Sequence, residues 1–154
     1  MTFEKATAQD TGMLTELRIA YLQEDLGEIE AADLKLIESL LPGYYEKHLN
    51  KDLMVYVARN EKDIVSCAFL LIVEKPMSPS LITGKTGTVL NVYTKPEYRK
   101  KGYAKKLMNM MLEDAKAENV SIIELKATED GYSLYRSVGF DDVAAKYHNM
   151  RISL

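Results

Sequence analysis

A basic segment that contains glycine, Arg99–Ala104, joins a run typical of a β-strand to a run typical of an α-helix. The run before it is Val89–Thr94, and in Lys105–Leu112 after it apolar residues recur at helical spacing. A helix start carries unpaired backbone N–H groups and a partial positive charge, so it favours phosphate. Gly102 lets the backbone approach a ligand closely, and the lysines and arginine add full charges. The segment therefore predicts a strand–loop–helix unit with an anion site in the loop.

Composition restricts the class of protein. The chain has 154 residues, of which 47% are hydrophobic and 28% charged, and this predicts one soluble domain spanning 1–154. A net charge of −3 argues against a nucleic-acid partner. The start has no signal-peptide layout and no apolar stretch could span a bilayer, so we expect a cytoplasmic protein without a membrane partner.

Neither the cysteine nor the histidines indicate a metal site. The only cysteine, Cys67, lies in an apolar strand-like run, so we expect a buried, unreactive thiol. His48 and His148 have no paired ligand spacing, and we predict no metal.

The order of expected elements indicates a mixed α/β domain, with a strand–helix–strand crossover from 88 to 128 that brings two parallel strands together. We expect Pro42-Gly43 to interrupt the second helix before a further turn or helix at 44–49, and 74–87 to form a loop. The apolar run 121–128 is typical of a central, buried strand. The expected strands are 2–6, 53–59, 64–73, 88–94, 121–128 and 147–154, and the expected helices are 8–25, 31–41, 102–119 and 132–138.

Two landmarks resemble those of the GNAT superfamily of N-acetyltransferases. In Val92–Ala104, the residues Arg99, Gly102 and Ala104 fill the three defined positions of the family's acetyl-coenzyme A motif. The run Leu134–Phe140 resembles the second landmark, a Leu-Tyr followed shortly by Gly-Phe. The resemblance covers nearly the whole chain. It implies an α/β fold with a central mixed sheet of about six to seven strands flanked by about four helices.

The resemblance also implies acetyl-coenzyme A (acetyl-CoA) as cosubstrate and a role for several residues. Backbone N–H groups of the loop would hold the pyrophosphate together with Arg99, and the preceding strand would pair with the pantetheine arm. A backbone N–H near Val92 would polarise the acetyl carbonyl, and Tyr135 would protonate the departing thiolate unless it is a core aromatic residue. The implied cosubstrate-binding residues are Val92, Tyr93, Thr94, Arg99, Lys100, Lys101, Gly102, Tyr103, Ala104 and Thr128.

Two positions depart from the family pattern. Thr128 stands where the family often has Asn, and Gly131 stands where it often has Ala. Thr128 can offer a hydroxyl group to the coenzyme but cannot make two amide contacts.

The general base is not evident, because the strand 88–94 contains no acid. Asn91 could orient a water molecule or the acceptor, or it could belong to a strand bulge or edge. Glu124 could be a carboxylate base in an apolar strand, or it could face solvent. We expect an ordered water molecule to serve as the relay.

An acidic segment marks a candidate acceptor wall. Glu24, Glu28 and Glu30 lie in a stretch without basic residues and could attract a cationic amine, or they could form a solvated helix face. We therefore predict an N-acetyltransferase that moves an acetyl group to a primary amine by direct attack in a ternary complex. The acceptor would be a small-molecule amine, preferably cationic, or a peptide. The alternative is a CoA-binding regulatory or sensor domain without catalysis, and a homodimer stays open.

Overall fold

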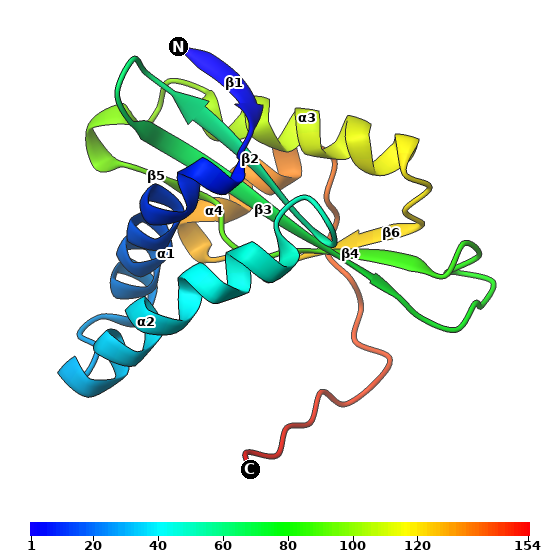
Figure 1. The fold of residues 1–154 in the computed structure, drawn as a ribbon. Coiled ribbons are helices and arrows are strands. Elements are labelled where there is room, and N and C mark those ends of the chain that lie inside the picture. Colours follow the sequence, from blue (N-terminus) through cyan, green and yellow to red (C-terminus); the bar gives the residue numbers. More distant parts are fainter.

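A mixed sheet of six strands forms the centre of the computed structural model, which describes residues 1–154 (Figure 1). The strand order is β1-β2-β3-β4-β6, and β5 pairs with β3 beyond the end of β4. All pairs are antiparallel except β4 with β6, which is parallel as the crossover predicts. The strands are β1 Thr2–Lys5, β2 Leu53–Arg59, β3 Ile64–Glu74, β4 Lys85–Val89, β5 Tyr93–Thr94 and β6 Ile122–Glu124.

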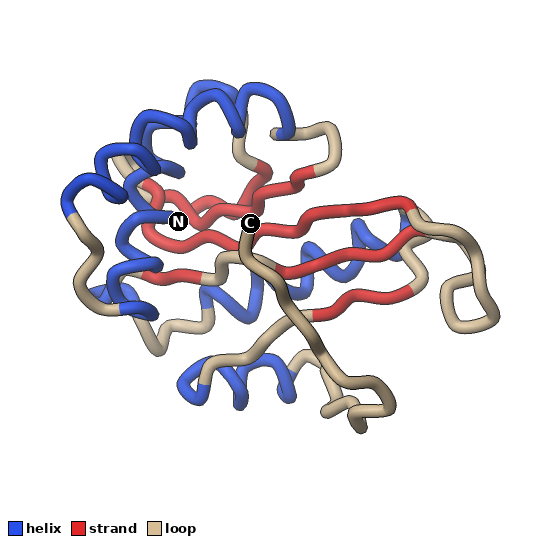
Figure 2. The backbone as a smooth tube through the Cα atoms, turned by 90° about the horizontal axis from the view of Figure 1, so that it is seen from below, coloured by secondary structure: helices blue, strands red, loops and turns tan.

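Four α-helices cover the two faces of the sheet, so the predicted α/β architecture is confirmed (Figure 2). Strands β2 and β3 are buried on both faces, and their side chains alternate between two cores. One core joins α1 and α2 to the sheet, and the other joins α3 and the region of α4 to it. The helices are α1 Thr11–Leu26, α2 Ala31–His48, α3 Tyr103–Ala117 and α4 Glu129–Ser137, with 3-10 turns η1 Ala8–Asp10 and η2 Pro96–Tyr98.

The second helix is not interrupted at Pro42-Gly43, so that prediction was wrong. Proline removes one helical hydrogen bond, and both residues are exposed, so water can solvate the carbonyl left without a donor. The turn beyond them is held by packing, because Tyr45 is buried and its hydroxyl group donates to the Leu14 carbonyl at 3.4 Å.

The predicted loop 74–87 and strand 88–94 also have different limits. Strand β3 extends to Glu74 and β4 already begins at Lys85, so the loop is shorter. The expected strand 88–94 is two strands separated by residues 90–92, which form no ladder pairs. Gly87 lies within β4 rather than in a loop, where it pairs with Ile72 of β3. A glycine suits this strand position because the buried Leu70 side chain occupies the space of a Cβ.

The end of the sheet differs most from the prediction. The run 121–128 forms only the three residues of β6, and it lies at the edge of the sheet rather than at its centre. The segment 147–154, predicted as the closing strand, pairs with nothing and is exposed. Helix α4 begins at Glu129, three residues before the predicted start. The predicted left-handed stop at Gly139 is confirmed by its φ of 106°, and Phe140 packs against the core.

Replacement of Gly87 by Ala should destabilise the fold. The new Cβ would lie 2.8 Å from Leu70 Cδ1 and 3.3 Å from Ile123 Cγ1, in a buried part of the sheet. We expect a loss of about 1–3 kcal/mol in the free energy of unfolding, measured by urea titration. Gly43→Ala is the control, because nothing lies within 4 Å of its Cβ position in α2. Equal stability of the two variants would contradict the proposed packing.

Candidate active site

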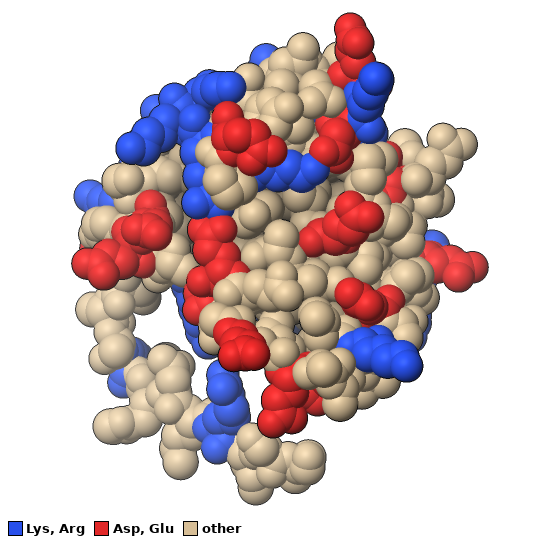
Figure 3. All heavy atoms as spheres, turned by 90° about the vertical axis from the view of Figure 1, so that its left-hand side faces the viewer, with Lys and Arg blue, Asp and Glu red and all other residues tan.

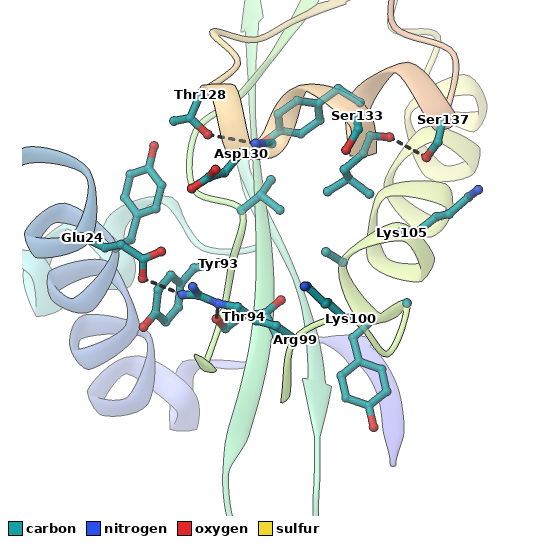
Figure 4. Close-up of a pocket in the computed structure, with 18 of the residues that line it drawn as sticks. Glu24, Tyr93, Thr94, Arg99, Lys100, Lys105, Thr128, Asp130, Ser133 and Ser137 are labelled. Atoms are coloured by element: carbon teal, nitrogen blue, oxygen red, sulfur yellow. Dashed lines mark hydrogen bonds and ion pairs between the residues drawn. The ribbon is translucent and has the colours of Figure 1, made fainter. Parts of the chain in front are cut away.

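A cavity opens where the two parallel strands separate. Strands β4 and β6 pair only from Thr86–Thr88 against Ile122–Glu124, and beyond that point β5 turns to pair with β3. The cavity has a volume of about 720 Å³ and is bounded by α1, β5, the start of α3, and α4 (Figure 4). A separation between parallel strands at their carboxyl ends is a common position for ligands in α/β proteins.

The loop that enters α3 provides a row of unpaired backbone donors. None of the six N–H groups from Lys100 to Lys105 donates to an acceptor within the protein. Lys100 and Gly102 have left-handed φ values of 59° and 79°, and such residues can turn successive N–H groups toward one point. Together with the partial positive charge of the α3 N-terminus, this geometry suits a phosphate group.

Arg99 connects this loop to helix α1. Its guanidinium donates to Glu24 Oε2 at 2.5 Å and to the Thr94 carbonyl at 2.8 Å, and it lies over the Tyr93 ring (Figure 4). The Glu24 carboxylate raises the pKa of Arg99. Both side chains are partly exposed, so the ion pair adds little stability. Glu24 thus contacts the arginine that the resemblance assigns to the pyrophosphate.

Residues 90–92, between β4 and β5, form a bulge against β3, and this bulge presents another free backbone donor. The Val92 N–H has no acceptor within the protein, and the edge of β5 that faces away from β3 has no partner strand. An extended ligand could pair with this edge as an added strand.

Asn91 supports the bulge from inside rather than lining the cavity. It is fully buried, and its Oδ1 accepts from Arg18 Nη1 of α1 at 3.1 Å. Its Nδ2 contacts Cys67 Sγ of β3 at 3.5 Å. These contacts hold the bulge between α1 and the sheet, so Asn91 can affect chemistry at Val92 by positioning its backbone.

Tyr135 lines the cavity from α4. Burial, followed by the nearby Tyr21 phenol, raises its pKa to about 12, so it is protonated at neutral pH. Its ring packs edge-on against Phe140, and its hydroxyl group makes no hydrogen bond within the protein. A protonated phenol with a free hydroxyl group can act as a proton donor.

The two departures from the family pattern have a local explanation. The Thr128 hydroxyl oxygen caps α4 by accepting from the Gly131 N–H at 3.2 Å. A Cβ on residue 131 would lie 2.9 Å from Tyr135 Cε2 and 3.2 Å from Thr128 Oγ1. Gly131 therefore leaves room for the tyrosine ring beside the cap.

The structure brings most of the predicted site residues to one cavity. Five of the predicted residues do not line it: Lys101, whose ammonium lies over the Tyr98 ring, and Asn91, Glu28, Glu30 and Glu124. The three glutamates are partly or fully exposed. The predicted residues that do line it are Glu24, Val92, Tyr93, Thr94, Arg99, Lys100, Gly102, Tyr103, Ala104, Thr128 and Tyr135.

Several lining residues were not predicted from the sequence. Tyr21 and Asp25 share a helical face with Glu24, and that i, i+3, i+4 spacing could have indicated them. The remaining ones depend on how η2, α3, α4 and the chain before α4 pack around the cavity, which no local pattern encodes. They are Tyr98, Lys105, Lys126, Asp130, Gly131, Ser133, Leu134 and Ser137.

Acidic side chains are scattered over the face that presents α1 and α2, with basic side chains among them (Figure 3). Because acidic and basic side chains share this face, the charge of the face does not by itself favour a cationic or an anionic acceptor.

Comparison with known proteins assigns the family. The model of the Acetyltransferase (GNAT) family matches residues 15–140. The chain belongs to the GNAT acetyltransferase family. It is therefore an acyltransferase, and its family uses acetyl-CoA. No curated protein sequence is significantly similar to the chain.

Solved structures agree with this assignment. A predicted acetyltransferase of Clostridium acetobutylicum, crystallised with acetyl-CoA, superposes with a TM-score of 0.85 at 26% identity, covering 97% of this chain and 95% of that one. A GCN5-related N-acetyltransferase of Ralstonia eutropha JMP134 superposes with a TM-score of 0.80 at 21% identity, covering 97% of both chains. A ribosomal-protein-alanine N-acetyltransferase of Brucella melitensis biovar Abortus 2308 has a TM-score of 0.68 at 22% identity over both full chains.

No helix has the length and apolarity to cross a membrane. No group of three or more His, Cys, Asp or Glu side chains lies close enough together to hold a metal ion. The Cys67 thiol is fully buried, and burial raises its pKa to about 12. A neutral, enclosed thiol is a poor nucleophile.

The native protein should not react with iodoacetamide at neutral pH, because Cys67 is both buried and protonated. Mass spectrometry should show labelling only after denaturation, on the one cysteine of the chain. Rapid stoichiometric labelling of the native protein would contradict the assigned burial.

Proposed function

We propose that this GNAT enzyme transfers the acetyl group of acetyl-CoA to a primary amine by direct attack in a ternary complex, working as a single acetyltransferase domain. The observation that carries the proposal is the row of unpaired N–H groups from Lys100 to Lys105 at the start of α3. These donors, with Lys100 and Arg99 beside them, would hold the pyrophosphate of the coenzyme.

The remaining parts of the cosubstrate have matching surfaces. The open edge of β5 would pair with the amides of the pantetheine arm, which would bring the thioester toward the bulge. The free Val92 N–H would donate to the acetyl oxygen and stabilise the negative charge that develops there. Arg18, Asn91 and Cys67 hold that backbone in place.

The chemical step needs one nucleophile and one proton donor. The neutral amine nitrogen attacks the thioester carbonyl carbon, a C–N bond forms, and the C–S bond breaks. The thiolate receives a proton from Tyr135, the ammonium proton leaves to water, and the Tyr135 phenolate regains a proton from solvent before the next turnover. The pKa of the buried phenol is raised, but desolvation in the same cavity also raises the pKa of the thiol, which keeps the transfer accessible. A covalent route through Cys67 is disfavoured by its burial.

The general base and the acceptor amine are inferred from which acidic side chains line the cavity. Glu24 is engaged by Arg99, while Glu28, Glu30 and Glu124 do not line the cavity, so we propose a water relay as the base. Asp25 and Asp130 line the cavity and could attract an ammonium group, which supports a cationic small amine as acceptor. The acidic wall is nonetheless smaller than the sequence predicts.

Acetyl-CoA should bind through the loop backbone. Gly102 has a φ of 79°, and a side chain in the left-handed region costs about 1–2 kcal/mol, so Gly102→Ala should distort the donor row. We expect acetyl-CoA affinity, measured by calorimetry, to fall about tenfold. The matched control for Gly102→Ala is Gly12→Ala in α1, where nothing lies within 4 Å of the Cβ position.

Wild-type protein should bind acetylpantetheine, which lacks the pyrophosphate, about tenfold more weakly than acetyl-CoA. Equal affinity for the two ligands would exclude the loop as the pyrophosphate site.

Tyr135→Phe should lower turnover about 10²-fold while the affinity for acetyl-CoA stays nearly constant, because only the proton donor is lost. Thiol release would be followed with a panel of polyamines, aminoglycosides, amino acids and peptides. Since its pKa is raised to about 12, Tyr135 should remain protonated through pH 9, and its titration should not lower turnover below that pH.

The control variant is Tyr132→Phe, on the same helix but outside the cavity. It should keep wild-type turnover. If Tyr135→Phe matched it, Tyr135 would have no part in the mechanism. Binding of acetyl-CoA without turnover on any amine of the panel would favour the sensor alternative.

A further inference from the structure

One partly buried arginine of the protein has no carboxylate beside it. Arg18 lies in α1, and its only hydrogen bond runs from Nη1 to Asn91 Oδ1 at 3.1 Å. Every other arginine outside the exposed C-terminal segment pairs with an acid: Arg59 with Glu4 and Asp10, Arg99 with Glu24, and Arg136 with Asp141. Because a charge that leaves water without a counterion costs free energy, the unpaired guanidinium of Arg18 marks a place for an anion.

The contact with Asn91 does not account for the charge of Arg18. A neutral amide would satisfy Asn91 Oδ1 equally well, and a guanidinium has several N–H donors besides the one used here. The Nε and Nη2 atoms of Arg18 have no partner in the protein, and no buried polar side-chain atom of the protein lacks one. These two atoms are therefore accessible. Their N–H groups form the planar fork that matches a carboxylate.

Two tyrosines near Arg18 add further polar groups. The guanidinium lies 5.7 Å from the centre of the Tyr21 ring, and Tyr21 lines the cavity. Burial and then Asp52 raise the pKa of Tyr44 in α2, and the charge of Arg18 acts against that rise, so this phenol also lies near Arg18. The hydroxyl groups of Tyr21 and Tyr44 make no hydrogen bond within the protein, whereas those of four other tyrosines do. They can donate to the same anion.

Arg18 lies at the thioester end of the proposed site rather than at its pyrophosphate end. Its partner Asn91 directly precedes Val92, whose N–H is the proposed donor to the acetyl oxygen. Glu24, which contacts Arg99 of the pyrophosphate loop, lies about 9 Å further along the axis of α1. An anion bound by Arg18 would therefore lie beside the reacting carbonyl group, where the acceptor must bind.

We propose that Arg18 binds a carboxylate group of the acceptor, so that the substrates of this enzyme are amino acids. The inference rests on the proposed acetyl transfer and narrows its acceptor class. Two parallel N–H···O bonds from Nε and Nη2 would fix the orientation of the acceptor and bring its amine toward the thioester. The chemical step is the one described above, and its products are an N-acetyl amino acid and CoA.

The same face of α1 also favours one kind of amino acid. Asp25 lies seven residues after Arg18, about two turns further on, and lines the cavity. Its carboxylate can attract a second ammonium group of the acceptor, while Arg18 holds the carboxylate. Basic amino acids therefore fit this arrangement of charges best.

Matched acceptors test the proposal on the wild-type protein. Thiol release from acetyl-CoA would be measured with each L-amino acid and with its amide, in which a neutral group replaces the carboxylate. The amide has the lower amine pKa and so the larger neutral fraction, which favours the amide if no carboxylate is bound. We expect the preferred amino acid, a basic one, to have a kcat/KM at least about tenfold above that of its amide. Amides that react as well as every amino acid would overturn the proposal.

Calorimetric titration of the same pairs into protein saturated with CoA separates this proposal from the proposed function. An amino acid that binds about tenfold more tightly than its amide but is not acetylated would support the carboxylate site and contradict acetyl transfer. Equal affinities, or no binding of any amino acid, would overturn the carboxylate site even if other amines are acetylated.

Arg18→Gln should remove the preference for the carboxylate. The glutamine amide can still donate to Asn91, so turnover of the amide and affinity for acetyl-CoA should stay within about twofold of wild type, while KM for the amino acid rises about tenfold. Arg18→Lys keeps a charge and should recover part of that loss. The control Arg151→Gln changes an exposed arginine outside the cavity and should keep the preference. Equal losses for the amino acid and its amide, or an unchanged preference, in Arg18→Gln would overturn the proposal.

Discussion

The separation of β4 from β6 at the bulge of residues 90–92 is the feature on which the site depends. If the strand ran straight from Lys85 to Thr94, the parallel ladder with β6 could continue and no cavity would open. The buried Asn91 amide accepts from Arg18 and contacts Cys67, and so ties the bulge to α1 and β3. A buried amide side chain whose oxygen and nitrogen both have partners favours one backbone conformation, because burying either atom without a partner costs free energy.

The same bulge makes three kinds of donor available together. It frees the Val92 N–H, exposes one edge of β5, and directs the chain toward the loop where the N–H groups from Lys100 to Lys105 are unpaired. A phosphate, an extended amide arm and a developing oxyanion each need such donors. On the opposite wall of the cavity, Gly131 has no Cβ and therefore leaves room for the Tyr135 ring beside the Thr128 cap. The position of the proposed proton donor thus depends on a glycine at residue 131.

The sequence predicted what local patterns determine. The α/β order, the parallel crossover, the buried Cys67 and the loop at 99–104 all rest on periodicity or spacing within short segments. It offered a strand bulge at Asn91 only as one alternative, since residues 88–94 look like one continuous strand. Pro42 was misread because its exposure, which makes the lost hydrogen bond tolerable, is a property of tertiary packing. The edge position of β6 and the absence of a strand at 147–154 likewise depend on long-range pairing, which short sequence patterns do not encode.

The central claim is that backbone donors at the bulge and the loop hold the cosubstrate. The most direct measurement is the amide spectrum of ¹⁵N-labelled protein titrated with acetyl-CoA. The account predicts that the largest downfield shifts fall on Val92 and on the residues from Lys100 to Lys105, whose N–H groups gain acceptors. Saturable binding that leaves these amide signals in place and moves signals elsewhere would contradict it.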